Sequence, residues 1–76
     1  MTKAQFKKLR IGDKVRLSKR VKVDKWYGNL TLQSHMAIDG ELTVLEPPSI
    51  GVHYFSVHLS APKGDYFYTP QMIMPI

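Results

Sequence analysis

Residues 53–68, which read HYFSVHLSAPKGDYFY, are the stretch that decides the fold class. Polar and apolar residues alternate up to residue 59, so that Phe55, Val57 and Leu59 share one face, as in a half-buried strand. Residues 62–65 (PKGD) have the composition of a tight turn, and the aromatic residues 66–68 favour a second strand. The stretch therefore predicts a β-hairpin.

The residues that precede this hairpin predict a short helix and two more strands. Thr2 and Gln5 have the spacing of a capping box, which indicates a helical turn within residues 3–9. Residues 14–17 alternate, with Val15 and Leu17 expected to face inward, and residues 21 and 23 continue the alternation into a long hairpin. Residues 41–46 form a further strand, which two prolines end because they cannot donate to a sheet.

The end of the chain completes the pattern. Thr69 followed by Pro70 is a helix-start signal, and the few residues after it allow only a short 3₁₀ turn. Residues 74–76 remain as a last short strand. We therefore predict an all-β fold, a small five-stranded SH3-like barrel with a 3₁₀ turn before the last strand, as a single domain over residues 1–76. An oligonucleotide-binding barrel needs a helix between its third and fourth strands, and residues 60–65 are too few for one.

Length and composition exclude several classes of protein. A chain of 76 residues makes one small domain, whose core cannot also enclose a deep active site. Eight aromatic residues argue against disorder, and the absence of cysteine fits a reducing compartment. We find neither a secretory signal nor an apolar run of about 18 residues, so that a cytoplasmic protein without membrane contact is expected.

The charge is concentrated in the first third of the chain. Ten basic residues against Asp13 and Asp24 give residues 1–25 a charge of +8, whereas residues 26–76 carry −3. The ten basic residues are Lys3, Lys7, Lys8, Arg10, Lys14, Arg16, Lys19, Arg20, Lys22 and Lys25. A chain with this asymmetry can present a basic face to nucleic acid or to an acidic protein.

The best candidate for a binding surface is the predicted first hairpin. If Val15, Leu17 and the valines at 21 and 23 face inward, four cations face outward on one surface. The predicted partner-binding residues are Lys14, Arg16, Lys19, Arg20, Lys22 and Lys25 as charge contacts, with Trp26 and Tyr27 as anchors. The alternative is a solvated edge that protects a strand from aggregation.

The aromatic residues also have two interpretations. Trp26 and Tyr27 are expected mainly to pack and turn at the end of the barrel, with stacking on a ligand as the alternative. The tyrosines at positions 54, 66 and 68 predict at least one outward tyrosine stripe, for cross-strand pairing or for contact with a partner. The apolar C-terminus is expected to close the barrel, and if part of it is exposed it could join copies of the chain.

No catalytic, metal or cofactor site is predicted. His35, His53 and His58 are the only imidazoles, and no carboxylate lies beside His53 or His58 at the spacing of metal ligands. The standard catalytic motifs are absent from the sequence. Domains that recognise proline-rich peptides commonly carry acidic residues in the long loop after the first strand. The corresponding residues here, 18–36, carry four cations and Asp24, so the partner should be acidic.

The residue pattern resembles that of small SH3-like proteins encoded by phages and prophages of Gram-positive bacteria. The resemblance runs from Leu9 to Met72. Its elements are GDKVRL at residues 12–17, WYG at 26–28, Leu30, Leu32, Met36, the strand GELTV at 40–44, and Tyr66, Tyr68 and Met72. It implies a mobile-element protein that works inside a bacterial host. By analogy, such proteins often bind a host macromolecule, including defence nucleases.

We therefore expect a non-enzymatic binding module. Its basic first hairpin would contact an acidic surface of a host or defence protein, as an inhibitor or adaptor. The first alternative is a nucleic-acid-binding barrel that contacts phosphates, and the second is a virion or assembly component.

Overall fold

Short strands dominate the computed structural model, which describes residues 1–62 and 64–76. In chain order, the elements are α1 (Lys3–Lys7), β1 (Lys14–Leu17), β2 (Trp26–Tyr27), β3 (Leu30–Thr31), the 3₁₀ helix η1 (Ser34–Met36), β4 (Leu42–Val44), β5 (Ser49–Ile50), β6 (Phe55–Ala61), β7 (Gly64–Tyr68), the 3₁₀ helix η2 (Pro70–Met72) and β8 (Ile73–Pro75). The prediction of a mainly β fold is confirmed.

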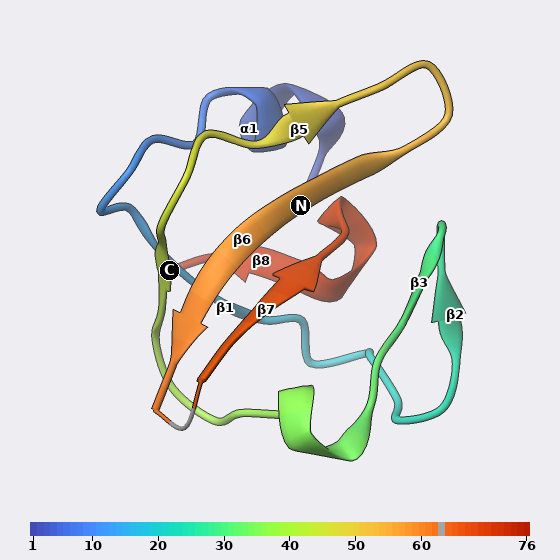
Figure 1. Cartoon of the computed structure of the whole chain (residues 1–76). Helices are drawn as coiled ribbons and strands as arrows, with labels where there is room; N and C mark the ends of the chain where they lie inside the picture. The colour runs from blue at the N-terminus through green and yellow to red at the C-terminus, as the bar shows by residue number, and fades with distance from the viewer. Residues whose placement is uncertain (63) are drawn as a thin grey trace.

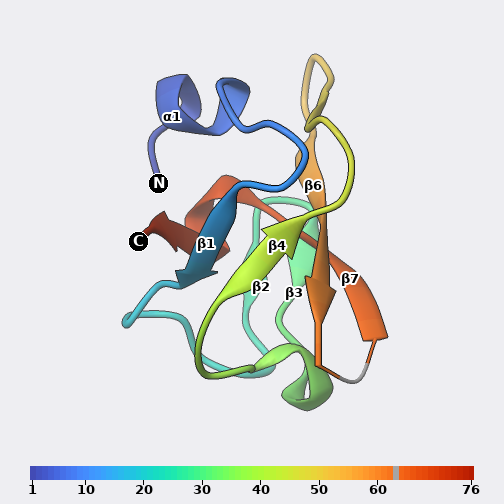
Figure 2. The ribbon, with the colours of Figure 1, turned by 90° about the vertical axis from the view of Figure 1, so that its left-hand side faces the viewer.

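The strands form a curled antiparallel sheet, which makes about half of a barrel (Figures 1 and 2). The strand order in the sheet is β5-β6-β4-β1-β8. The strand β7 lies off this path and pairs with β6. The strands β2 and β3 form a separate hairpin, which stands to one side of the sheet in Figure 1. The residue pattern does not predict the short pairings of β2, β3 and β5.

The hairpin of β6 and β7 is the longest pairing and has the predicted inward face. Val57 pairs with Tyr68, and Leu59 pairs with Tyr66. Val57 and Leu59 are buried and Phe55 is half-buried, which confirms the alternation in residues 55–59. The predicted turn at residues 62–65 includes Lys63, which lies outside the described residues.

The prediction of an outward tyrosine stripe is wrong for Tyr66 and Tyr68. Tyr68 is fully buried and Tyr66 is half-buried, because residues 64, 66 and 68 form the inward face of β7. The outward side chain of this strand is Phe67, and Tyr54 lies in the exposed loop before β6. The Tyr68 hydroxyl donates to the Met36 carbonyl at 3.1 Å. Burial, and secondarily the neighbouring Tyr66, raise the pKa of Tyr68 to about 12.

Both ends of the chain contribute to the core, and the C-terminal strand β8 is itself part of the sheet. The capping box of Thr2 and Gln5 is present at α1, whose Phe6 is fully buried. Near the other end, η2 begins at Pro70 as predicted, and β8 pairs with β1 from Ile73. The core gathers side chains from both ends and from the sheet, namely Phe6, Val15, Leu32, Met36, Leu42, Val44, Val57, Leu59, Tyr68, Met72 and Ile73. Within the described residues, no helix is long and apolar enough to cross a membrane.

Candidate functional site

The predicted binding residues divide between β1 and the connection that follows it. Lys14 and Arg16 are exposed on β1, on either side of the buried Val15. Lys19, Arg20, Lys22 and Lys25 are exposed in residues 18–25, which join β1 to β2. Figure 2 shows this connection leaving the end of β1 on the left of the molecule. We call these six side chains the basic surface.

Residues 18–25, which the alternation predicts as part of a long, partly extended hairpin, turn twice instead. Asp24 has a positive φ of 68°, and the chain turns at residues 19–20 and 23–24. The Lys22 amide donates to the Tyr27 hydroxyl at 2.7 Å, and the Asp24 amide donates to the Leu32 carbonyl at 2.7 Å. These local bonds replace the ladder of a hairpin. As a result, the four cations Lys14, Arg16, Arg20 and Lys22 do not form one row along a strand.

The charges of the basic surface are not neutralised within the described residues. The two ion pairs found there both belong to His58, and no lysine or arginine lies within 4 Å of a carboxylate oxygen. The Lys14 ammonium donates to the Thr43 hydroxyl at 2.7 Å, a neutral partner that leaves its charge intact. An unpaired set of exposed cations leaves a positive potential that an acidic partner can use.

Trp26 and Tyr27 have different roles, although they are adjacent in β2. The Tyr27 side chain is half-buried and its hydroxyl holds the Lys22 amide, so it packs and shapes the connection as expected. Trp26 is 73% exposed, so its expected packing is wrong. The alternation of a two-residue strand explains this, because only one of two successive side chains can face the body of the protein.

Trp26 borders a groove of about 400 Å³ between the β2–β3 hairpin and β7. Tyr66, Phe67 and His35 also line this aromatic groove. The His35 and Tyr66 rings lie 4.9 Å apart, and the Phe67 side chain is 51% exposed. Exposed aromatic rings are a feature of protein interfaces and of sites for single-stranded nucleic acid, although the charged side chain in the lining of this groove is the acidic Asp65.

His58 lies between two carboxylates, which the sequence spacing does not predict. Its Nδ1 is 3.3 Å from Glu46 Oε2, and its Nε2 bonds to Asp65 Oδ2. The ring also stacks on Phe67, with centroids 4.6 Å apart and planes 14° from parallel. The pairing of β6 with its neighbours brings these residues together from positions 7 and 12 residues away.

The two carboxylates contact His58 from the neighbouring segments of the sheet. The two carboxylates bind opposite ring nitrogens, so their oxygens do not converge on one point. Within residues 1–62 and 64–76, no group of three His, Asp or Glu side chains has the arrangement to hold a metal ion.

A second groove, of about 490 Å³, is lined by none of the six cations of the basic surface and is not predicted by any motif. We call it the Thr69 groove, after a buried residue in its wall whose hydroxyl has no hydrogen-bond partner among the described residues. Its lining comes from four separate segments, which explains why sequence spacing does not reveal it.

Comparison with known proteins gives no further assignment. No protein-family model, curated protein or solved structure matches the chain.

Proposed function

We propose that the protein is a non-enzymatic binding module that contacts an acidic surface of a partner protein through its basic surface. The observation that carries this proposal is the absence, within the described residues, of any carboxylate paired with the six exposed cations. Surface cations that serve solubility alone are commonly mixed with acids, whereas a recognition surface keeps one sign.

The exposed Trp26 strengthens this proposal. Tryptophan and arginine are the residues most enriched among those that dominate the energy of protein interfaces. Trp26 follows Lys25 directly, so an apolar anchor and a cation stand at the same end of the basic surface. A partner with acidic side chains around an apolar hollow would match both features.

We further propose that the curled sheet is a small SH3-like barrel and that the protein comes from a mobile element, as a module acting on a host or defence protein. The pairing of β1 with β8 directly after η2 supports the barrel assignment. The residue pattern described above supports the origin. A bacterial cytoplasm is then the place where the partner is met.

The test is capture of partners from a bacterial lysate by the wild-type protein and by a variant in which Lys14, Arg16, Arg20 and Lys22 are all replaced by Glu. All four side chains are exposed, so the variant should retain the fold, which circular dichroism verifies. We expect the variant to lose an acidic protein that the wild type retains. Equal capture by both proteins would show that the basic surface is only solvated.

Single-stranded nucleic acid is a second candidate partner, and the aromatic groove favours it. Trp26 offers an exposed ring, and Phe67 is 51% exposed although His58 stacks on one of its faces. Stacking of a base on an exposed ring contributes about 1–3 kcal/mol. Labelled single strands titrated at two salt concentrations test this candidate. Binding by phosphate contacts weakens steeply with salt, and an absence of binding at low salt would remove nucleic acid from consideration.

A further inference from the structure

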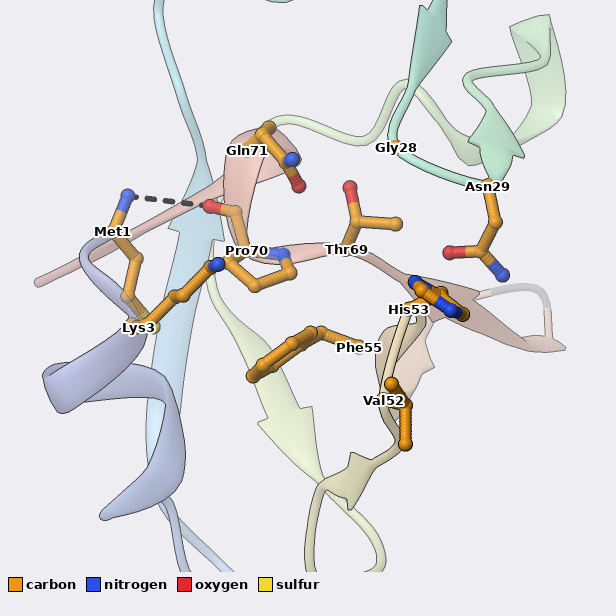
Figure 3. A pocket seen from close by; sticks show the side chains of 10 residues that line it. All are labelled: Met1, Lys3, Gly28, Asn29, Val52, His53, Phe55, Thr69, Pro70 and Gln71. Carbon is orange, nitrogen blue, oxygen red and sulfur yellow. Dashed lines mark hydrogen bonds between the residues drawn. The ribbon is translucent and has the colours of Figure 1, made fainter.

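The Thr69 groove has the shape of a small-ligand site. Figure 3 shows side chains from the N-terminal segment, the β2–β3 turn, the loop before β6 and η2 arranged around a common hollow. Its volume of about 490 Å³ falls within the range of sites that hold small molecules and cofactors. The side chains that the argument uses are Lys3, Asn29, Phe55, Thr69 and Gln71.

Thr69 is the feature that the fold alone does not explain. Its side chain is 1% exposed and its hydroxyl has no hydrogen-bond partner among the described residues. It precedes η2 in the N-cap position but makes no capping bond. In Figure 3 the hydroxyl lies on the side of Gln71, whose exposed side chain can turn away. A buried polar group without a partner is costly, and a ligand that bonds to it offsets that cost.

The rest of the lining defines the chemistry of the ligand. Lys3 supplies a cation, and none of the lining residues is acidic, so the groove favours an anion. The Lys3 ammonium lies 5.1 Å from the centroid of the Phe55 ring, so a cation and an aromatic ring line the groove side by side. Asn29 and Gln71 add amides at the rim, which can both donate and accept.

We propose that the Thr69 groove binds a free nucleoside 5′-monophosphate. This ligand combines a planar ring for Phe55, a phosphate for Lys3, and donors and acceptors that suit the amides and the Thr69 hydroxyl. Gly28 lines the groove beside these groups, and a Cβ there would make ordinary van der Waals contact with the Gln71 amide nitrogen at 3.5 Å and with Thr69 Cγ2 at 3.7 Å. The site is separate from the basic surface and does not depend on the function proposed above.

The test is titration of the full chain, labelled for NMR, with AMP, GMP, CMP and UMP in separate experiments. We expect at least one of them to bind with a Kd of about 10 μM to 1 mM, as suits an open groove, and to shift the amide signals of residues around Thr69. Adenosine and inorganic phosphate, titrated separately, should each bind more weakly than the nucleotide that joins a base to a phosphate. Absence of binding by all four nucleotides, or equal binding of phosphate alone, would overturn the proposal.

Variants separate this site from a structural role of the same residues. Thr69→Val should weaken nucleotide binding about two- to tenfold, the loss expected for one hydrogen bond, while the folded protein becomes no less stable. Thr69→Ser keeps the hydroxyl and should bind closer to wild type. The matched control, Arg20→Glu with Lys22→Glu, should bind nucleotide as the wild type does. Unchanged affinity in Thr69→Val, or a loss in the control as large as in Thr69→Val, would contradict the assignment.

Discussion

Replacement of Tyr68 by Phe tests how the core is held together around η1. The Tyr68 hydroxyl is buried and donates to the Met36 carbonyl at 3.1 Å. The same carbonyl also accepts from the Ile38 amide at 3.0 Å, so the substitution leaves it with one partner. We therefore expect Tyr68→Phe to lower the free energy of unfolding by about 1 kcal/mol, which is at the low end for loss of a buried hydrogen bond. This corresponds to a fall in Tm of about 4–8 °C for a domain of this size.

The pH dependence of this difference is a sharper test than its size. The pKa of Tyr68 is raised to about 12 in the folded protein from 10.0. The unfolded chain therefore releases this proton first, so the wild type loses stability as the pH rises from 10 towards 12. The shift corresponds to about 2–3 kcal/mol in total, which exceeds the advantage of the hydroxyl at neutral pH. Wild type should be the more stable protein at about pH 8 and the less stable one near pH 12.

Urea unfolding followed by circular dichroism, with both proteins measured over this pH range, gives the comparison. Trp26 fluorescence is a poor probe here because the side chain is already 73% exposed. Charged groups that do not interact with Tyr68 contribute equally to both proteins and cancel in the difference, whereas the interaction of Tyr68 with Tyr66 is part of the measured effect. A stability difference that stays constant from about pH 8 to pH 11 would refute the reasoning.

Three further substitutions test other parts of the structure. Gly28→Ala should lower the free energy of unfolding in urea by about 1 kcal/mol, because the φ of 66° is unfavourable for an L-residue. The nearest atoms, at 3.5–3.7 Å, leave room for a Cβ, so no steric clash adds to this loss. An unchanged unfolding midpoint would contradict this. Trp26→Ala should change the stability by less than about 0.5 kcal/mol while it weakens partner capture, and a large fall in Tm would show that the ring packs. Thr2→Ala should lower the free energy of unfolding by about 1 kcal/mol because it removes the capping box of α1, and wild-type stability in chemical denaturation would argue against that contribution.

Local patterns were enough to predict the parts of the fold that short-range chemistry determines. The alternation at Phe55, Val57 and Leu59 places the long hairpin correctly, because burial of one face imposes a period of two. The capping box at Thr2 and the proline at position 70 likewise locate α1 and η2.

The same patterns fail where contacts distant in sequence decide the structure. Val21 and Val23 alternate with cations as a strand would, but bonds from this segment to Tyr27 and Leu32 make it turn instead. The direction of Tyr66 and Tyr68 depends on the register of β7 with β6, which composition does not specify.

The candidate sites show the same division. Exposure of the six cations follows from their chemistry, and the sequence predicts it. Exposure of Trp26, the carboxylates on His58 and the unpartnered Thr69 hydroxyl arise only when separate segments meet. Neither spacing nor composition contains a signal for the Thr69 groove.

The central claim is that the basic surface binds an acidic partner, and a pair of charge-matched variants tests it most directly. Arg20→Glu with Lys22→Glu, and Lys7→Glu with Lys8→Glu, each lower the formal charge from +5 to +1, but the second pair lies at α1, outside the basic surface. Quantitative capture of the acidic partner from lysate should fall strongly for the first variant and remain near wild type for the second. Equal losses for both variants, or no loss for either, would contradict the account.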